Sequence, residues 1–219
     1  AGGGKGIRRG VGGVWRGGAG EGGLKGKTFV GRGYRVGAGK AAWQMAHAAR
    51  ACWQDNFCGG VVVTKYGHVK GEIANVACFE GGHPVPDENS LRGTDAALAL
   101  TEDLTESDTV VFLLSGGGSA LFEKPLLPLA ELQDVTNQLL AAGADIVEIN
   151  TIRKRLSAVK GGRFARHCAP AQVFAVVLSD ILGDPLDMIA SGPAYPDSSS
   201  CAQALDIAKR YGLRLSERA

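Results

Sequence analysis

Residues 36–42 of the 219-residue sequence combine glycine and lysine at a spacing that suits phosphate binding. Gly37 and Gly39 would let backbone N–H groups approach an anion, and Lys40 at the start of a helix adds positive charge. The segment is not a Walker A loop, because Ala41 replaces the hydroxyl that binds Mg²⁺ in that motif. It also fits the G-x-G-x-x-A pattern of nicotinamide sites, so taken alone it is a weak signal.

A second segment places three consecutive glycines between two hydroxyl side chains, directly after the apolar run 110–114. Its residues are Ser115, Gly116, Gly117, Gly118 and Ser119. Such a run offers backbone N–H donors to phosphoryl or carboxylate oxygens. A flexible hinge is the alternative, but a surface hinge does not usually follow a buried strand so closely. We therefore predict that this segment binds a ligand.

The third segment, residues 150–163, has polar side chains at helical spacing. The stripe consists of Asn150, Arg153 or Lys154, Ser157 and Lys160, followed by Gly161 and Gly162. A charged stripe is usually a solvated helix face. The amide of Asn150 and the lysine-glycine ending favour anion binding instead.

A fourth segment follows the apolar run 173–178 and is rich in aspartate, glycine and proline. Asp180 and Asp184 could hold Mg²⁺ or accept a hydroxyl proton, although capping and turn formation are ordinary roles for aspartate. Ser191 and Gly192, further along, are additional binding candidates. His83, between glycine and proline, lies in a rigid turn, and its role stays open.

These segments need elements that position them, and the chain alternates strand and helix signals from Tyr34 onward. Apolar runs at 61–63, 110–114 and 173–178 predict buried parallel strands. Helices are predicted at 41–54, 88–104, 129–142, 145–159 and 199–211. The expected fold is α/β, a three-layer Rossmann-like domain with a mostly parallel sheet. Ligands of such folds bind beyond the carboxyl ends of the strands.

Residues 1–33 differ from the rest, because they contain 15 of the 33 glycines. We interpret them as a poorly specified tract without catalytic residues, followed by one domain over residues 34–219. The tract has seven basic residues and one acidic residue, which leaves 17 basic against 21 acidic residues beyond it. This balance argues against nucleic-acid binding. Neither a membrane span nor a signal peptide is evident, so a cytoplasmic protein is expected.

Taken together, the segments resemble the glycerate 2-kinase family of the MOFRL type, some members of which are named hydroxypyruvate reductases. The resemblance runs from about Tyr34 to the end and rests on V-G-A-G-K-A-A, V-V-T-K-Y-G-H, G-H-P-V-P-D, S-G-G-G-S-A-L, E-I-N-T-I-R-K-R-L-S-A-V-K-G-G-R, S-D-I-L-G-D-P-L-D-M-I-A-S-G-P and Y-P-D. It implies ATP-dependent phosphorylation of D-glycerate to 2-phosphoglycerate with Mg²⁺. It also implies that this chain is the family's Rossmann-like N-terminal domain without its C-terminal domain.

The resemblance implies roles for individual residues. Lys40 would correspond to the family's active-site lysine, and the 115–119 loop would hold substrate or nucleotide phosphate. Asn150, Arg153 and Lys160 would add donors. Our hypothesis is that Lys40 and the loop stabilise the transferring phosphoryl group, that Asp180 or Asp184 engages Mg²⁺, and that Arg153 pairs with the glycerate carboxylate.

Two other functions remain open at this point. An NAD(P)H-dependent hydroxypyruvate reductase would use the G-x-G-x-x-A pattern, Lys65 near a 2′-phosphate, and an acid such as His83. A ligand-binding fragment without turnover is the third reading. The sequence does not assign ATP and glycerate to particular loops, and it is compatible with a homo-oligomer.

Overall fold

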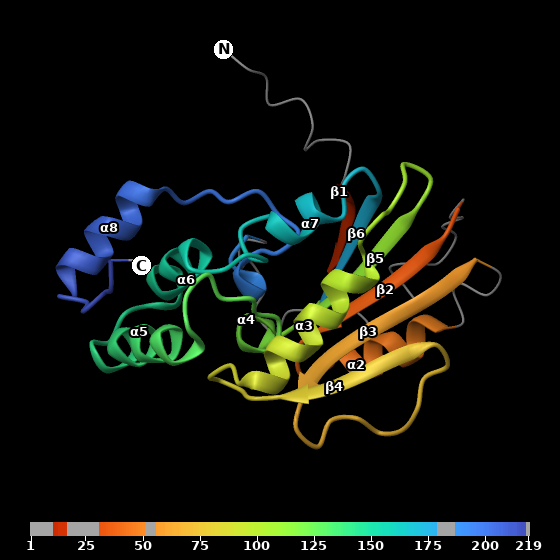
Figure 1. Cartoon of the computed structure of the whole chain (residues 1–219), viewed down its shortest axis with the longest axis horizontal. Coiled ribbons are helices and arrows are strands. Elements are labelled where there is room, and N and C mark those ends of the chain that lie inside the picture. Colours follow the sequence, from red (N-terminus) through yellow and green to blue (C-terminus); the bar gives the residue numbers. More distant parts are fainter. Residues whose placement is uncertain (1–10, 17–30, 51–55, 179–186, 218–219) are drawn as a thin grey trace, which may run out of the picture.

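The computed structural model describes residues 11–16, 31–50, 56–178 and 187–217, and its centre is a six-stranded sheet (Figure 1). The strands are β1 (Val11–Arg16), β2 (Gly33–Ala38), β3 (Phe57–Lys65), β4 (Val76–Gly81), β5 (Thr109–Ser115) and β6 (Gln172–Leu178). They lie in the order β1-β6-β5-β2-β3-β4, and every pairing is parallel. The predicted α/β fold is confirmed.

Helices cover both faces of this sheet, as the three-layer prediction requires. They are α2 (Ala42–Ala49), α3 (Glu88–Leu100), α4 (Gly118–Leu121), α5 (Leu129–Ala141), α6 (Ile146–Arg155), α7 (Arg163–His167) and α8 (Cys201–Arg210), with a 3-10 turn, η3, at Ile189–Ser191. Side chains of a strand alternate between faces. Phe112 and Leu114 therefore pack with α3, α4 and α7, whereas Val111 and Leu113 pack with α2.

Local sequence explains where three of these helices begin. Asp87, Asp145 and Ser200 each cap a helix by accepting a hydrogen bond from the backbone N–H three residues later. In each case the side chain at that later position bonds back to the capping residue, which completes a capping box. The helix starts predicted near 88, 145 and 199 are confirmed within two residues.

Helices α5, α6 and α8 form a separate cluster beside the sheet, which the sequence did not predict. Their apolar side chains pack on one another, with Leu132, Ile149 and Ile207 among the buried residues. Figure 1 shows the three helices at the opposite end of the molecule from strands β2 to β4. Helix α6 also packs on η3, and its residue Arg153 is buried.

The N-terminal tract contributes one strand, where we expected no packed element. Strand β1 pairs in parallel with the edge of β6, with Val14 opposite Ala175. Main-chain pairing to a neighbour supplies the order that glycine side chains cannot provide. Strand β4, at the other edge of the sheet, was also not predicted. The proposed boundary between residues 33 and 34 falls inside β2.

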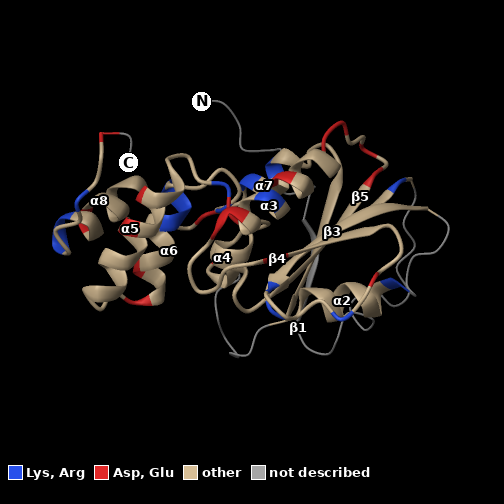
Figure 2. Cartoon of the chain, turned by 60° about the horizontal axis from the view of Figure 1, so that its bottom comes forward, with Lys and Arg blue, Asp and Glu red and all other residues tan. Residues whose placement is uncertain are grey.

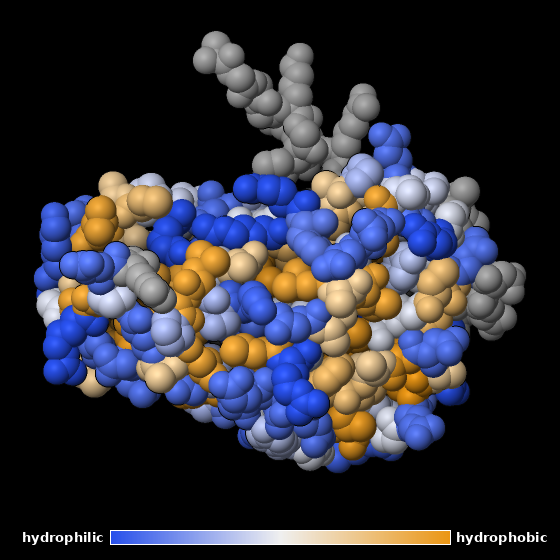
Figure 3. All heavy atoms as spheres, viewed as in Figure 1, coloured by the Kyte–Doolittle hydropathy of each residue, from blue (hydrophilic) through white to orange (hydrophobic). Residues whose placement is uncertain are grey.

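The distribution of charged and apolar residues fits a sheet that is covered by helices. Most of the length of the strands is uncharged, and Lys, Arg, Asp and Glu lie mainly on helices and connections (Figure 2). On the face seen in Figure 3, apolar residues are interrupted by hydrophilic ones. Within the described ranges, no helix combines the length and apolar character needed to cross a membrane.

The strand order creates a switch point between β2 and β5. From β2 the chain moves outward through β3 and β4, and it then returns to β5 on the other side of β2. The chain leaves these two central strands toward opposite edges of the sheet, and open α/β sheets bind ligands at such a point. Two of the four candidate segments, 36–42 and 115–119, lie at this point.

Candidate functional site

The turn after β2 is fixed to the loop after β5 by its own backbone. The Gly39 amide donates to Val63 O at 3.1 Å, and the Lys40 amide donates to Gly116 O at 2.9 Å. The Ala41 amide donates to Ser115 Oγ at 3.0 Å. We expected free N–H groups at Gly37 and Gly39, and this was wrong, because Gly37 lies inside β2 and the Gly39 amide is bonded. Their place in the ligand site stays a prediction.

Gly39 is needed for this close approach. Its φ is +124°, a conformation that other residues rarely adopt. A Cβ there would lie 2.3 Å from Ser115 Oγ and 2.5 Å from Ser115 O. The side chain of Ser115 is itself buried. The turn and the loop therefore form one rigid unit at the switch point.

The 115–119 loop keeps backbone donors at its centre. Gly117 has a φ of +88°, and the short helix α4 starts at Gly118. No acceptor among the described residues receives the amides of Gly117, Gly118 and Ser119. A Cβ on Gly118 would lie 2.7 Å from Ala190 Cβ, so the loop packs tightly against η3. The predicted anion-binding loop thus has the necessary N–H groups.

Two side chains lie against Gly117. A Cβ on Gly117 would be 3.0 Å from His83 Nε2 and 3.3 Å from Lys40 Cε. Lys40 is exposed, and no described residue forms a hydrogen bond or ion pair with its ammonium group. Burial lowers the pKa of His83, and the positive charges of Lys40, Lys65 and Arg153 lower it further. The charges of three cations therefore act on one imidazole beside the loop.

Arg153 is the buried member of this group. The residue is 9% exposed, and its guanidinium has no hydrogen-bond partner in the described part of the chain. Burial lowers the pKa of Arg153, while the carboxylate of Glu123 acts in the opposite direction. A buried guanidinium without hydrogen bonds is costly. An anionic ligand at this position would remove that cost.

Asn150, Ser191 and Ser119 form a chain of buried and partly buried hydrogen bonds. Ser191 Oγ donates to Asn150 Oδ1 at 2.8 Å, and Ser191 Oγ and Ser119 Oγ lie 3.0 Å apart. The amide of Asn150 also donates to Met188 O at 3.0 Å. Ala190, Ser191 and Gly192 all have left-handed φ values between 53° and 60°. The chain holds α4, α6 and this strained turn together, and direct ligand binding by its members stays a prediction.

Lys160 is an anchor inside the structure. Its ammonium donates to the carbonyls of Ser119 and Phe122, both at 2.8 Å, and lies 3.3 Å from Glu123 Oε2. It is fully buried, and burial lowers the pKa of Lys160. Helix α6 ends at Arg155, so the predicted helical stripe does not extend to Ser157 and Lys160. Whether Lys160 contacts a ligand remains untested, and in this structure its donors hold α4.

The Gly161-Gly162 ending is also bonded internally. Their amides donate to Ser191 O at 3.0 Å and to Gly192 O at 2.8 Å. Both glycines have positive φ values. The ending therefore ties the segment after α6 to the strained turn, and our expectation of free N–H groups there was wrong.

Carboxylates near the site divide into two sets. Asp180 and Asp184, the predicted Mg²⁺ ligands, lie outside the described residues. Asp187 and Asp197 are described, and each lies 3.2 Å from the buried ammonium of Lys154. In the described ranges, no three His, Cys, Asp or Glu side chains gather as a metal ion would require.

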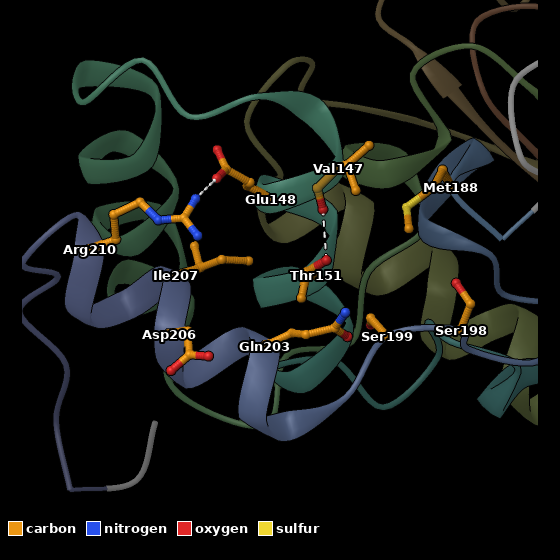
Figure 4. Close-up of a pocket in the computed structure, with 10 residues that line it drawn as sticks. All are labelled: Val147, Glu148, Thr151, Met188, Ser198, Ser199, Gln203, Asp206, Ile207 and Arg210. Atoms are coloured by element: carbon orange, nitrogen blue, oxygen red, sulfur yellow. Dashed lines mark hydrogen bonds and ion pairs between the residues drawn. The ribbon is translucent and has the colours of Figure 1, made fainter.

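A cavity of about 360 Å³ lies elsewhere, between α6 and α8 (Figure 4). Its lining residues are Val147, Glu148, Thr151, Met188, Ser198, Ser199, Gln203, Asp206, Ile207 and Arg210. Glu148 pairs with Arg210, and Thr151 donates to Val147 O. None of the predicted site residues lines it.

From the sequence we assigned His83 and Lys65 only to the alternative reductase site. We did not identify Glu123 as a candidate. His83 lies between β4 and α3, Lys65 ends β3, and Glu123 follows α4. The G-H-P turn was visible as a rigid segment, but nothing in the sequence tells which loop it faces. Glu123 is an isolated acid in the sequence, and only the fold brings it to Lys160.

Comparisons with known proteins cover most of the chain. Residues 23–219 match the family model described as "Domain of unknown function (DUF4147)". A "D-glycerate 2-kinase" from Thermotoga maritima is 56% identical over 184 residues, which are 83% of this chain and 44% of that protein. A "Putative hydroxypyruvate reductase" from Agrobacterium vitis is 44% identical over 186 residues, with 84% of this chain and 42% of that protein covered.

A solved structure agrees with these sequence matches. The crystal structure of glycerate kinase from Thermotoga maritima matches with a TM-score of 0.82 and 55% identity, over 86% of this chain and 46% of that one. The chain spans less than half of the length of each of these relatives.

Proposed function

The chain belongs to the DUF4147 family, and from that premise we propose that it is part of a glycerate 2-kinase that transfers a phosphoryl group from ATP to the 2-hydroxyl of D-glycerate. The relatives' names support this reading, since they include a D-glycerate 2-kinase at 56% identity. Catalysis of phosphoryl transfer depends on positioning and on neutralising charge. A site for it needs clustered donors and cations.

One observation supports the proposal most. Lys40 and His83 lie together against a glycine loop whose amides have no acceptor among the described residues, and the charges of Lys40, Lys65 and Arg153 all lower the pKa of His83. The glycine loop and Lys40 lie at the switch point of a parallel sheet, where α/β proteins bind ligands. Exposed Lys40 and buried Arg153 have no hydrogen bonds to the described residues, so both are available to oxygen atoms of a ligand.

We assign the roles by distance and chemistry. Lys40 lies against Gly117, so its ammonium and the amides of residues 117–119 would bind the transferring phosphoryl group together. Arg153 would pair with the glycerate carboxylate, for which a guanidinium offers two parallel hydrogen bonds. Asn150, Ser191 and Lys160 would keep α4 and α6 at the correct separation.

ATP is the proposed phosphoryl donor, and Mg²⁺ is proposed to neutralise its phosphate oxygens. Asp180 and Asp184 are the proposed metal ligands. Among the described carboxylates, Asp187 and Asp197 are paired with Lys154, so they are not available as ligands in this arrangement. The proposal includes a cytoplasmic location and assembly into a homo-oligomer.

Replacing Lys40 tests the proposal. We expect Lys40→Ala in the intact protein to lower kcat by about 10²-fold or more, because a preorganised charge at the phosphoryl group is lost. Its free energy of unfolding should stay within about 0.5 kcal/mol of wild type, since Lys40 is exposed. A coupled assay of ADP release with D-glycerate measures kcat, and Lys209→Ala on exposed α8 is the matched control. Wild-type kcat in Lys40→Ala would contradict the assigned role.

The reductase reading has one observation in its favour, because two relatives are named putative hydroxypyruvate reductases. Reduction of a ketone by hydride needs a proton donor. His83 suits that task poorly, because three cations disfavour its protonated form. Incubation with hydroxypyruvate and NADPH, beside glycerate and ATP, distinguishes the two functions by which cofactor is consumed.

A further inference from the structure

His83 is held firmly at the mouth of the proposed site. The turn that contains it is fixed by Asp87, which caps α3 and accepts a hydrogen bond from Tyr66 Oη at 2.7 Å. Gln133 of α5 donates to Pro86 O at 2.8 Å. The imidazole therefore lies against Gly117. A Cβ on Gly117 would be 2.8 Å from His83 Cδ2 and 3.0 Å from His83 Nε2. A residue so placed faces the same space as Lys40.

The charges around His83 come from three different elements. Lys40 lies in the turn after β2, Lys65 ends β3, and Arg153 projects from α6. Asp87, the acid in its own turn, is bound to Tyr66 and to the backbone of α3. Each cation disfavours a proton on the ring, so His83 is a neutral imidazole near neutral pH. A hydrogen bond to the backbone of His83 itself raises the pKa of His83, but this effect is smaller than those of burial and of the cations.

A neutral imidazole near cations accepts a proton more readily when bound anions offset the positive charges. ATP phosphates and a substrate carboxylate would offset the charges of Lys40, Lys65 and Arg153. The proton affinity of His83 then rises when the substrates are bound. General bases are most effective when their pKa lies near the working pH.

We propose that His83 accepts the proton of the substrate hydroxyl during phosphoryl transfer, an inference that rests on the kinase function proposed above. The hydroxyl oxygen forms a bond to the γ-phosphorus as the bond from that phosphorus to the β,γ-bridging oxygen breaks. The bridging electron pair leaves with ADP, and the hydroxyl proton moves to His83 Nε2. The proton later passes to solvent.

Kinetics of His83→Gln test this step. The amide keeps polarity but cannot accept the proton, so kcat should fall by about 10²-fold or more. Wild-type kcat should decline as pH falls and His83 becomes protonated, whereas the variant's lower kcat should lack that decline. Rescue of the variant by added imidazole would support the role. His167→Gln is the matched control, since His167 is exposed on α7 and contacts Leu98 O.

Proton NMR of the histidine rings gives a readout without turnover. In the intact wild-type protein, inorganic phosphate should raise the pKa of His83 and leave His167 unchanged. Lys40→Ala should raise the pKa of His83 without phosphate, because one of the surrounding cations is removed.

The outcomes separate this inference from the function on which it rests. If wild-type protein does not phosphorylate glycerate, the kinase proposal itself fails. If wild type is active and His83→Gln retains its kcat and pH profile, only the role of His83 is overturned. A pKa of His83 that does not respond to phosphate or to Lys40→Ala would overturn the charge argument.

Discussion

The two ends of the central sheet hold buried charges in opposite states. At the amino end, the Asp108 carboxylate precedes β5 and accepts hydrogen bonds from the Arg32 side chain at 2.7 and 3.1 Å and from the Thr105 amide at 2.7 Å. At the carboxyl end, the Arg153 guanidinium is buried without a hydrogen bond to any described residue. The first charge is satisfied by the protein, and the second is the charge that we propose to bind the substrate.

This difference separates stabilising charges from binding charges better than residue type does. Lys160 lies at the carboxyl end and was a binding candidate, yet its three contacts are all internal. Arg153 lies seven positions earlier in the chain, and its guanidinium forms no hydrogen bond or ion pair with the described residues. Burial raises the cost of a charge at both positions, and only the partners differ.

The largest effect is expected for Lys160→Met. It leaves the Glu123 carboxylate buried without its cation and frees two carbonyl groups. We expect a loss of about 3–5 kcal/mol in the free energy of unfolding, measured by urea denaturation. Adding Glu123→Gln should recover part of the loss, because the orphaned charge is removed. A loss below about 1 kcal/mol would mean that Lys160 is not an internal anchor.

A smaller loss is expected for Asp108→Asn at the amino end. Hydrogen bonds from Arg32 hold the pKa of Asp108 well below its usual range. The stabilisation is therefore present above the unfolded pKa of about 3.9 and is lost as pH falls toward the folded value. We expect Asp108→Asn to lower the free energy of unfolding by about 2 kcal/mol at pH 7, as measured by urea denaturation. The difference between wild type and variant should become smaller below about pH 4. Asp95→Asn, in an exposed ion pair with Lys124, should cost about 0.5 kcal/mol or less.

The smallest effect on stability, with the opposite sign, is expected for Arg153→Met. Methionine removes a buried charge that no described residue satisfies, so stability should stay constant or rise by about 1 kcal/mol. Glycerate binding, measured by calorimetry, should be lost. Arg92→Met on the exposed face of α3 is the control. A destabilisation above about 2 kcal/mol would place Arg153 with Lys160 and Asp108 and would break the comparison.

The sequence predicted the central strands and most helices because their side chains follow clear patterns. The run from Val110 to Leu114 is apolar throughout and begins with two β-branched residues, and it forms a fully buried strand. Strand β4 was missed because it is an edge strand whose apolar run is only four residues long and ends at Glu80. Strand β1 was missed because its order comes from the backbone of β6.

Parts of the candidate site depended on long-range contacts that the sequence does not encode locally. The glycine loop at 116–118 was placed correctly at the end of β5, since a buried strand and three glycines define it. The burial of Lys160 follows from Glu123, which lies 37 positions away and has no motif. The end of α6 at Arg155 was also unpredictable, because neither glycine nor proline follows it closely.

The close approach of Gly39 to Ser115 has an evolutionary consequence. Any side chain at position 39 would collide with Ser115, and the hydroxyl of Ser115 is the acceptor for the Ala41 amide. Position 39 is therefore restricted to glycine whatever residue stands at position 115, because the backbone of Ser115 also blocks a Cβ there. Position 115 is less restricted, since a smaller residue there removes the acceptor of the Ala41 amide without causing a collision. We therefore expect mutational drift to reach position 115 before position 39, although the two residues touch in the fold.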